Sequence, residues 1–269
     1  MTDPSRGDSP PRVLVAEDNP VAQKVAVAML EGLGCAVDVV ATGHAAVEAV
    51  RRTAYALVFM DCDMPALDGY EATRLIREAE AEAGRHTPIL ALSAHTMPTE
   101  RKKSLAAGMD DHLVKPFRLD DLRGALARWT RGPAERAPGD PGAPPEARPA
   151  EIRGAGADLD LAQIAEYLAF PGLFGEVVER FVHRGAEALD AMEGAVRRGD
   201  AGSLAAAAHA LRGGAGLVGA RRLVALCRDI EERARTGEAE LAAEVRRARA
   251  AHQEAARDLA AERDRMTVR

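Results

Sequence analysis

The chain has 269 residues, enough for two domains of ordinary size, and 47% of them are hydrophobic while only 3% are aromatic. The net charge is −6 and no segment is strongly basic, which argues against a nucleic-acid-binding protein. No run approaches the ~18 consecutive apolar residues of a membrane span, and the polar leader 1–11 lacks the apolar core of a secretory signal. The three scattered cysteines form no C-x-x-C pair and indicate reduced thiols, so we expect a cytoplasmic protein.

Residues 12–130 alternate between short apolar runs and amphipathic segments. The expected strands cover 12–16, 37–40, 56–60, 89–92 and a run ending at 113–114. The expected helices cover 20–32, 43–52, 70–83, 99–108 and 119–129, the first opened by Asn19-Pro20. Five strand–helix repeats predict an α/β domain built on a doubly wound parallel sheet of five strands.

Polar residues of this region stand where the strands end. They are Glu17 and Asp18 after the first strand, Asp61 after the third, Ser93 after the fourth and Lys115 after the fifth. The carboxyl ends of parallel strands share one edge of the sheet, so we expect these side chains to converge. Three neighbouring carboxylates repel one another unless a hard cation such as Mg²⁺ neutralises them. A lysine and a hydroxyl beside such a cation are typical of a phosphoryl-transfer site.

These residues give 12–130 a resemblance to the receiver domain of two-component response regulators. The resemblance is carried by Glu17-Asp18, by Asp61 with Met-Pro and Asp-Gly following it, by Ser93-Ala94 and by Lys115-Pro116. It implies a flavodoxin-like fold with Asp61 as the phosphoacceptor. It also implies Mg²⁺ held by Asp18, Asp61 and the backbone carbonyl of Asp63 with Glu17 nearby, phosphoryl oxygens bound by Ser93 and Lys115, and a cis Lys115–Pro116 bond.

Two features of this region leave alternatives open. His112 stands where many receivers carry an aromatic switch residue, three positions before the lysine, and its role at that position is open. The Asp61-Cys62-Asp63 sequence also resembles the catalytic pair of haloacid-dehalogenase-like phosphatases. Those enzymes are expected to place further acids on a later strand, whereas here the acidic pair comes first and the lysine closes the domain.

The rest of the chain consists of a linker and a helical domain. Residues 131–157 are rich in Pro, Gly and Ala without apolar periodicity, which indicates a flexible linker. Residues 158–269 show only helical periodicity, with helices expected at 159–169, 173–198, 201–217, 220–236 and 238–265. Short connections between the long helices predict an up-and-down four-helix bundle.

One histidine of the helical domain stands apart from the rest. The apolar stripe of its helix consists of Leu204, Ala208, Leu211 and Ala215. His209 lies roughly 120–140° from that stripe, so we expect it to face solvent between small residues, with Arg212 beside it. Apart from His112, the other histidines of the chain lack this setting, and we expect no special role for them. They are His44, His86, His95, His183 and His252.

The segment A-H-A-L-R-G-G-A-G-L-V-G around His209, with L-C-R-D-I-E after it, is similar to histidine-containing phosphotransfer domains. The resemblance implies that His209 accepts and donates a phosphoryl group without a metal. It implies that Arg212 and Gly213 contribute to phosphate binding or docking, with Arg212 in place of the lysine usual in this family.

Both resemblances together predict a phosphorelay protein that carries a phosphoryl group between Asp61 and His209. The expected partners are an upstream sensor histidine kinase and a downstream response regulator or phosphotransfer protein, with neither nucleic acid nor a membrane. No G-x-x-x-x-G-K-[ST] segment occurs, so we expect a transfer intermediate and not a kinase. The chain could instead be the C-terminal portion of a hybrid sensor histidine kinase, or a binding module that has lost its transfer chemistry.

Overall fold

The computed structural model describes residues 10–93, 98–130, 159–167, 170 and 172–267. The leader expected at 1–11 lies almost wholly outside these residues, and so do the linker expected at 131–157 and His95. The chain divides into two compact units, Met1–Arg148 and Pro149–Arg269, and each is described by itself. Within the described residues, no helix has both the length and the apolar character needed to cross a membrane.

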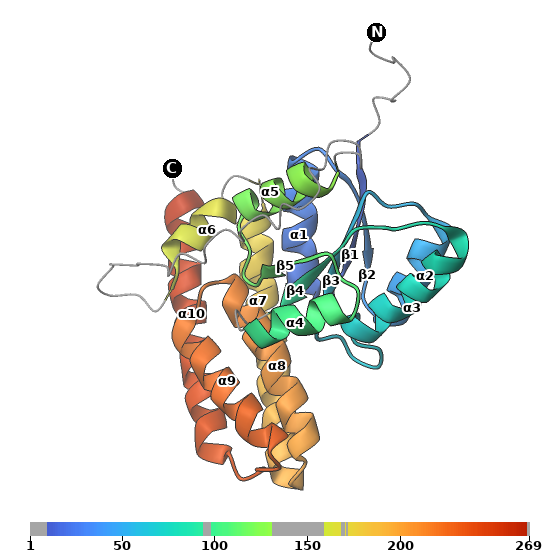
Figure 1. The fold of residues 1–269 in the computed structure, drawn as a ribbon. Coiled ribbons are helices and arrows are strands. Elements are labelled where there is room, and N and C mark those ends of the chain that lie inside the picture. Colours follow the sequence, from blue (N-terminus) through green and yellow to red (C-terminus); the bar gives the residue numbers. More distant parts are fainter. Residues whose placement is uncertain (1–9, 94–97, 131–158, 168–169, 171, 268–269) are drawn as a thin grey trace. The chain divides into compact units, whose positions relative to one another are not determined.

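The first unit is a parallel sheet of five strands in the order β2-β1-β3-β4-β5 (Figure 1). Its strands are β1 (Arg12–Ala16), β2 (Ala36–Val40), β3 (Leu57–Asp61), β4 (Ile89–Ser93) and β5 (Asp111–Val114). Its helices are α1 (Pro20–Gly32), α2 (Gly43–Arg52), α3 (Gly69–Ala83), α4 (Pro98–Ala106) and α5 (Leu119–Trp129). Helices α1 and α5 lie together on one face of the sheet, and α2 and α3 lie together on the other. The predicted doubly wound α/β fold is confirmed.

Local sequence explains how these elements begin and why the strands are apolar. Every residue of β3 and β4 is buried, because helices cover both faces of the sheet. The side chain of Asn19 accepts hydrogen bonds from the backbone N–H groups of Val21 and Ala22, and Pro20 occupies the first helical position of α1. Asp68 caps α3 in the same way, through the N–H of Glu71.

The strand register brings the expected polar positions to one edge. Ala16, the last residue of β1, pairs with Met60, and Asp61 pairs with Leu92. Ser93 in turn pairs with Val114 at the end of β5. The ends of β1, β3, β4 and β5 therefore lie side by side. The acids, the serine and the lysine either close these strands or follow them within two residues.

The second unit is a four-helix bundle preceded by a short helix. Its helices are α6 (Leu161–Tyr167), α7 (Leu173–Arg198), α8 (Ala201–Leu217), α9 (Arg221–Arg235) and α10 (Ala242–Thr267). Helix α7 packs against α8, α8 against α9, α9 against α10 and α10 against α7, so the four long helices close a ring (Figure 1). This arrangement confirms the predicted bundle.

Two details of the bundle differ from the sequence-based expectation or add to it. Helix α10 begins at Ala242 and not at 238, because Arg233 binds Glu238 and Glu244 and holds the intervening segment as a loop. The ring of His252 fills the space above Gly185 on α7, where an added Cβ would lie 2.1 Å from its Nε2. That close approach explains the glycine in the middle of a long helix.

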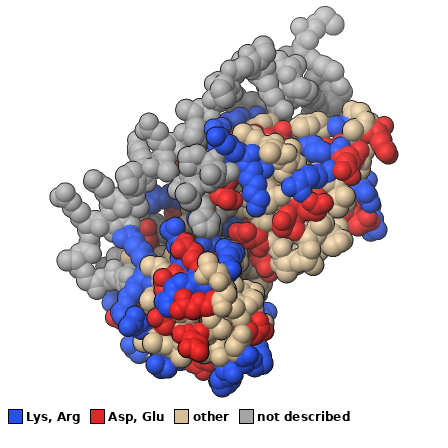
Figure 2. Space-filling view, turned by 60° about the horizontal axis from the view of Figure 1, so that its bottom comes forward, with Lys and Arg blue, Asp and Glu red and all other residues tan. Residues whose placement is uncertain are grey.

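The charges of the described surface are mixed. Figure 2 shows Lys and Arg side chains interspersed with Asp and Glu, and the described residues of the face in view carry no extended basic area. The described residues of this face therefore show no basic area of the kind that nucleic-acid binding requires.

Candidate functional site

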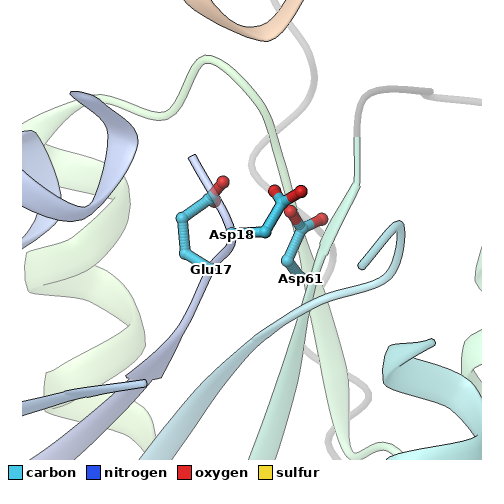
Figure 3. Close-up of side chains that lie close together, drawn as sticks. All are labelled: Glu17, Asp18 and Asp61. Carbon is cyan, nitrogen blue, oxygen red and sulfur yellow. The ribbon is translucent and has the colours of Figure 1, made fainter. Parts of the chain in front are cut away.

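Three carboxylates meet at the sheet edge. Oxygen atoms of Glu17, Asp18 and Asp61 all lie within 4.8 Å of one another. Figure 3 shows the carboxylates of Asp18 and Asp61 next to each other, with that of Glu17 beside them. Glu17 and Asp61 are buried, and Asp18 is half-buried. The end of β1 supplies two of these acids and the end of β3 supplies the third.

Lys115 completes the cluster from the end of β5. Its Nζ lies 2.5 Å from Oε2 of Glu17 and 2.8 Å from Oδ2 of Asp61. Its backbone N–H donates to the carbonyl of Ser93 over 2.7 Å, which joins the ends of β4 and β5. The Lys115–Pro116 bond is cis, as expected. The structure thus brings all five residues singled out at the strand exits to one edge of the sheet.

Burial and charge act together on the acid–lysine cluster. Burial, and after it the charge of Asp61, raises the pKa of Glu17 to about 7, although Lys115 opposes the shift. Burial alone would lower the pKa of Lys115, but the charges of Glu17 and Asp61 more than offset it, so this pKa is raised. Lys115 is therefore a permanent cation among more carboxylates than it can neutralise.

The loop after β3 fixes the Asp61 carboxylate from the other side. The N–H of Asp63 donates to Asp61 Oδ1 over 3.2 Å, and the side chain of Asp63 is exposed. At Gly69 an added Cβ would lie 2.1 Å from the carbonyl oxygen of Asp61, so only glycine allows α3 to begin this close to the strand. The Met-Pro and Asp-Gly turn of the sequence therefore serves to fold the loop back onto Asp61.

The donor set at this edge fits a hard divalent cation. Carboxylate oxygens from three side chains lie close enough to share one ion, and one lysine leaves part of their charge unbalanced. Mg²⁺ prefers oxygen ligands and usually keeps several waters, which suits a cluster that is open at Asp18. Glu17, Asp18 and Asp61 are the residues that could hold it.

His112 lies within the sheet unit, on β5. Its side chain is 13% exposed, and among the described residues its Nδ1 is buried without a hydrogen-bond partner. Burial, with the nearby charge of Arg101, lowers the pKa of the ring, and Asp111 only partly opposes this. The ring is therefore neutral at physiological pH.

In the helical unit, His209 of α8 is held by an acid from α9. Its Nδ1 lies 2.9 Å from Oε1 of Glu231, a carboxylate that is only 1% exposed. The imidazole side chain is 25% exposed, which is less than the helical wheel predicts. The difference arises because α9 packs closely on α8 and Glu231 reaches the ring from the inside of the bundle.

Arg212 also differs from expectation. It is buried and not an exposed cation, and its Nε lies 3.2 Å from Oε2 of Glu231. A second arginine, Arg235, binds Oε1 of Glu231 over 2.6 Å and is itself about half exposed, while Gly213 is exposed on the next turn of α8. Sequence reasoning missed Glu231 and Arg235. The available signal was an acid on the apolar stripe of α9, four residues after the buried Cys227.

The contacts of Glu231 define the protonation of His209. Burial would raise the pKa of Glu231, but the hydrogen bond from His209 and the charges of Arg212 and Arg235 outweigh it, so this pKa is lowered. An ionised carboxylate can only accept, so the proton of the 2.9 Å contact belongs to Nδ1. Arg212 Nη2 lies 3.2 Å from the same nitrogen, but the shorter contact to an anion dominates. In the neutral ring, Nε2 then carries no proton and is the nucleophilic nitrogen.

Two models of known protein families match the chain. Residues 13–127 match the family model for the response regulator receiver domain, and residues 176–262 match the model for the Hpt domain. The chain contains a receiver domain and an Hpt domain. The Hpt match begins within α7 and ends within α10, so it spans the four helices of the bundle.

Curated relatives and solved structures resemble part of this receiver–Hpt chain. The sensor protein GacS of Pseudomonas syringae is 44% identical over 121 residues, and the signal transduction histidine-protein kinase BarA of Escherichia coli is 36% identical over 120 residues. Each match covers 45% of this chain but only 13% of the relative. The receiver domain of a sensor histidine kinase from Pseudomonas aeruginosa, crystallised with magnesium in its active site cleft, is 45% identical. That match covers 46% of this chain and 100% of the solved one, with a TM-score of 0.42.

Proposed function

We propose that this protein is a phosphorelay carrier that passes a phosphoryl group between Asp61 of the receiver domain and His209 of the Hpt domain. The observation that carries the proposal is the position of the Asp61 carboxylate, between the acidic pair and the ammonium of Lys115. A nucleophile placed between a candidate cation site and a fixed positive charge is what transfer of a highly charged phosphoryl group requires.

At the receiver, an Asp61 oxygen attacks the phosphorus of a phosphohistidine. The new P–O bond forms as the P–N bond breaks, and the bonding pair remains on the departing imidazole nitrogen. Lys115 and Ser93 bind phosphoryl oxygens, and Asp18, Asp61 and the backbone carbonyl of Asp63 would hold Mg²⁺ with Glu17 beside them. When bound, the cation neutralises charge on the phosphoryl oxygens.

At the Hpt domain, the Nε2 lone pair of His209 attacks the phosphorus of an aspartyl phosphate, and the O–P bond breaks with its electrons returned to the carboxylate. The imidazole gains positive charge in this step. The Glu231 carboxylate stabilises that charge through the hydrogen bond from Nδ1–H. Arg212 and Gly213 lie one turn along α8 and would contribute to phosphate binding or docking.

The proposed partners follow from the chemistry of the two carriers. A sensor histidine kinase supplies the phosphoryl group, and a response regulator or a further phosphotransfer protein receives it, in the cytoplasm. The similarity to GacS and BarA favours one particular form of this function, in which both domains belong to a hybrid sensor histidine kinase. An immunoblot of host cells distinguishes the two forms by mass, because a hybrid kinase is much larger than a carrier protein made of these two domains.

Phosphorylation with a small-molecule donor tests the proposal. The full chain, incubated with acetyl phosphate and Mg²⁺, should shift on a Phos-tag gel, and Asp61→Asn should abolish the shift. Asp120→Asn, at an exposed position of α5, is the matched control and should shift like wild type. The proposal fails, and a binding module remains, if wild type takes up no phosphoryl group from acetyl phosphate or from any sensor kinase of the host.

A second pair of variants tests the Hpt carrier. With a phosphorylated receiver as donor, His209→Gln should receive no acid-labile phosphoryl group. His183→Gln changes an exposed histidine of α7 and should receive it as wild type does. Equal labelling of both variants would remove His209 from the relay.

A further inference from the structure

A side chain from α1 holds the acidic pair at the end of β1 in place. The side-chain amide of Gln23 donates to the backbone carbonyl of Glu17, with Nε2 2.6 Å from the oxygen. A carbonyl only accepts, so the amide nitrogen, and not its oxygen, must face Glu17. Gln23 is half-buried in the second turn of α1.

This contact replaces a bond that the sheet no longer provides. Both ladders of β1 end at Ala16, which pairs with Val40 of β2 and with Met60 of β3, so the Glu17 carbonyl lies beyond the last rung. The N–H of Glu17 still donates to the Val40 carbonyl of β2 over 3.0 Å. A carbonyl buried at a strand end needs a donor from elsewhere, and Gln23 supplies it.

The hydrogen bond also defines the direction of Asp18. The carbonyl of Glu17 and the N–H of Asp18 belong to one planar peptide group, so fixing the oxygen fixes the plane from which the Asp18 side chain departs. The neighbouring residue Asn19 is fixed as well, because its N–H donates to Glu17 Oε1 over 3.1 Å. Asp18 is also the least buried of the three clustered acids.

Gln23 can do this because α1 is itself rigidly seated. The helix buries Val21, Ala22, Val25 and Ala26 against the sheet, on both sides of Gln23 in the sequence. The side chain therefore reaches back from a fixed helix to the strand end over six residues.

We propose that Gln23 is a positioning residue for the divalent cation of the receiver domain. It acts through the Glu17–Asp18 peptide group and sets the Asp18 carboxylate in the geometry that Mg²⁺ requires, an inference that rests on the proposed function. Positioning groups of this kind, one step removed from the ligands, influence metal affinity strongly.

Direct Mg²⁺ binding to the full chain tests the proposal. Isothermal titration calorimetry at pH 8 keeps Glu17 ionised, and it needs no phosphoryl transfer. Gln23→Met keeps the length of the side chain and removes the donor, and it should weaken Mg²⁺ binding by about threefold to tenfold. Gln253→Met makes the same chemical change at an exposed position of α10 and should bind like wild type.

The possible results distinguish failure of the role of Gln23 from failure of the proposed function. Unchanged Mg²⁺ affinity in Gln23→Met overturns the role of Gln23, even if its melting temperature falls, because a purely structural residue would affect stability alone. If Gln23→Met does not fold, Gln23→Asn, whose amide is one methylene too short to reach, is judged by the same affinity criterion. If wild type binds no Mg²⁺ at all, both this inference and the cation role in the proposed function fail. If wild type binds Mg²⁺ and Gln23→Met binds it equally well, this inference fails and the proposed function stands.

Discussion

Asp61 and His209 are brought into position in different ways. The surroundings of Asp61 come from the ends of β1, β3, β4 and β5, and Lys115 lies 54 positions further along the chain than the acid it contacts. His209 depends on two helices that follow one another directly, and its main partner Glu231 is 22 residues away. One site is a product of the whole sheet, and the other is a product of one helical hairpin.

This difference has consequences for stability and for sequence change. A site assembled from many segments exists only when the sheet is complete, so its charges are coupled to the folding of the entire receiver domain. A site on one helix pair depends on a single interface, and a change there should affect chemistry before it affects the fold.

The largest effect is expected from Lys115→Met in the metal-free protein. The change leaves Glu17 and Asp61 buried without their cation, so the free energy of unfolding of the receiver domain should fall by about 3 kcal/mol at pH 8. Urea denaturation in EDTA measures it. Lys102→Met, at an exposed position of α4, is the control. A loss no greater than that of Lys102→Met would show that the sheet site is not coupled to folding.

Glu231→Gln should act on the chemistry of the helical site. The variant retains an acceptor for Nδ1–H of His209 but removes the charge that balances the phosphorylated ring, so we expect the transfer rate to fall about tenfold. Glu232→Gln changes the adjacent, exposed acid and should transfer like wild type. Rates are read from the decay of labelled donor. Identical rates for the two variants would mean that Glu231 only supports the helix pair.

Glu17 of the receiver domain and His252 of the Hpt domain should contribute to the pH dependence of stability with opposite signs. Glu17 has a folded pKa of about 7 against 4.5 when unfolded, so its contribution is complete below 4.5 and is lost as the pH rises through about 7. Burial lowers the pKa of His252 below 6.5, so its contribution is complete above 6.5 and is lost as the pH falls further. Each slope is at most about 1.4 kcal/mol per pH unit.

The single tryptophan of the chain, Trp129, allows the two slopes to be separated. Its fluorescence follows the receiver domain alone, and far-UV circular dichroism adds the helices of the Hpt domain. In EDTA, Glu17→Gln should remove the receiver's loss of stability between pH 4.5 and about 7 and leave the opposite contribution of His112, and His252→Gln should reduce the slope of the Hpt domain. A receiver slope that Glu17→Gln leaves unchanged, or an Hpt slope that His252→Gln leaves unchanged, would refute the assignment.

The smallest effect is expected from Arg212→Lys. The buried guanidinium contacts Glu231 through Nε, and an ammonium group cannot reproduce its planar contacts, so the free energy of unfolding of the Hpt domain should fall by about 1 kcal/mol. Arg228→Lys alters an exposed pair on the same helix as Glu231 and should have no measurable effect in urea denaturation. Equal stability of both variants would place the Arg212–Glu231 pair among weak surface interactions.

The site at the sheet edge could be predicted from the sequence because parallel strands have a simple geometry. Once 12–16, 56–60 and 89–92 are predicted to be buried strands, the residues after them must share an edge. The same periodicity argument located the helices of the bundle and the stripe beside His209. Those predictions required only local patterns and the fixed direction of parallel strands.

Features that depend on the far side of an interface could not be predicted in this way. Periodicity places Arg212 near the surface, but only the packing of α9 on α8 shows that Glu231 draws it inside. The bond from Gln23 to the Glu17 carbonyl depends on where the sheet ladder ends, which is a tertiary property. The late start of α10 follows from contacts of Arg233 that no local pattern contains.

If Asp61 and His209 exchange a phosphoryl group, transfer must occur between two variants of this 269-residue chain that each lack one of the two carriers. His209→Gln protein is labelled at Asp61 with radioactive acetyl phosphate, freed of donor, and mixed with unlabelled Asp61→Asn protein. The account predicts that label appears on Asp61→Asn as an acid-labile, alkali-stable phosphohistidine, and not when His209 is also replaced. If the label is lost from Asp61 only at its rate of hydrolysis and none reaches the second protein, the account is contradicted.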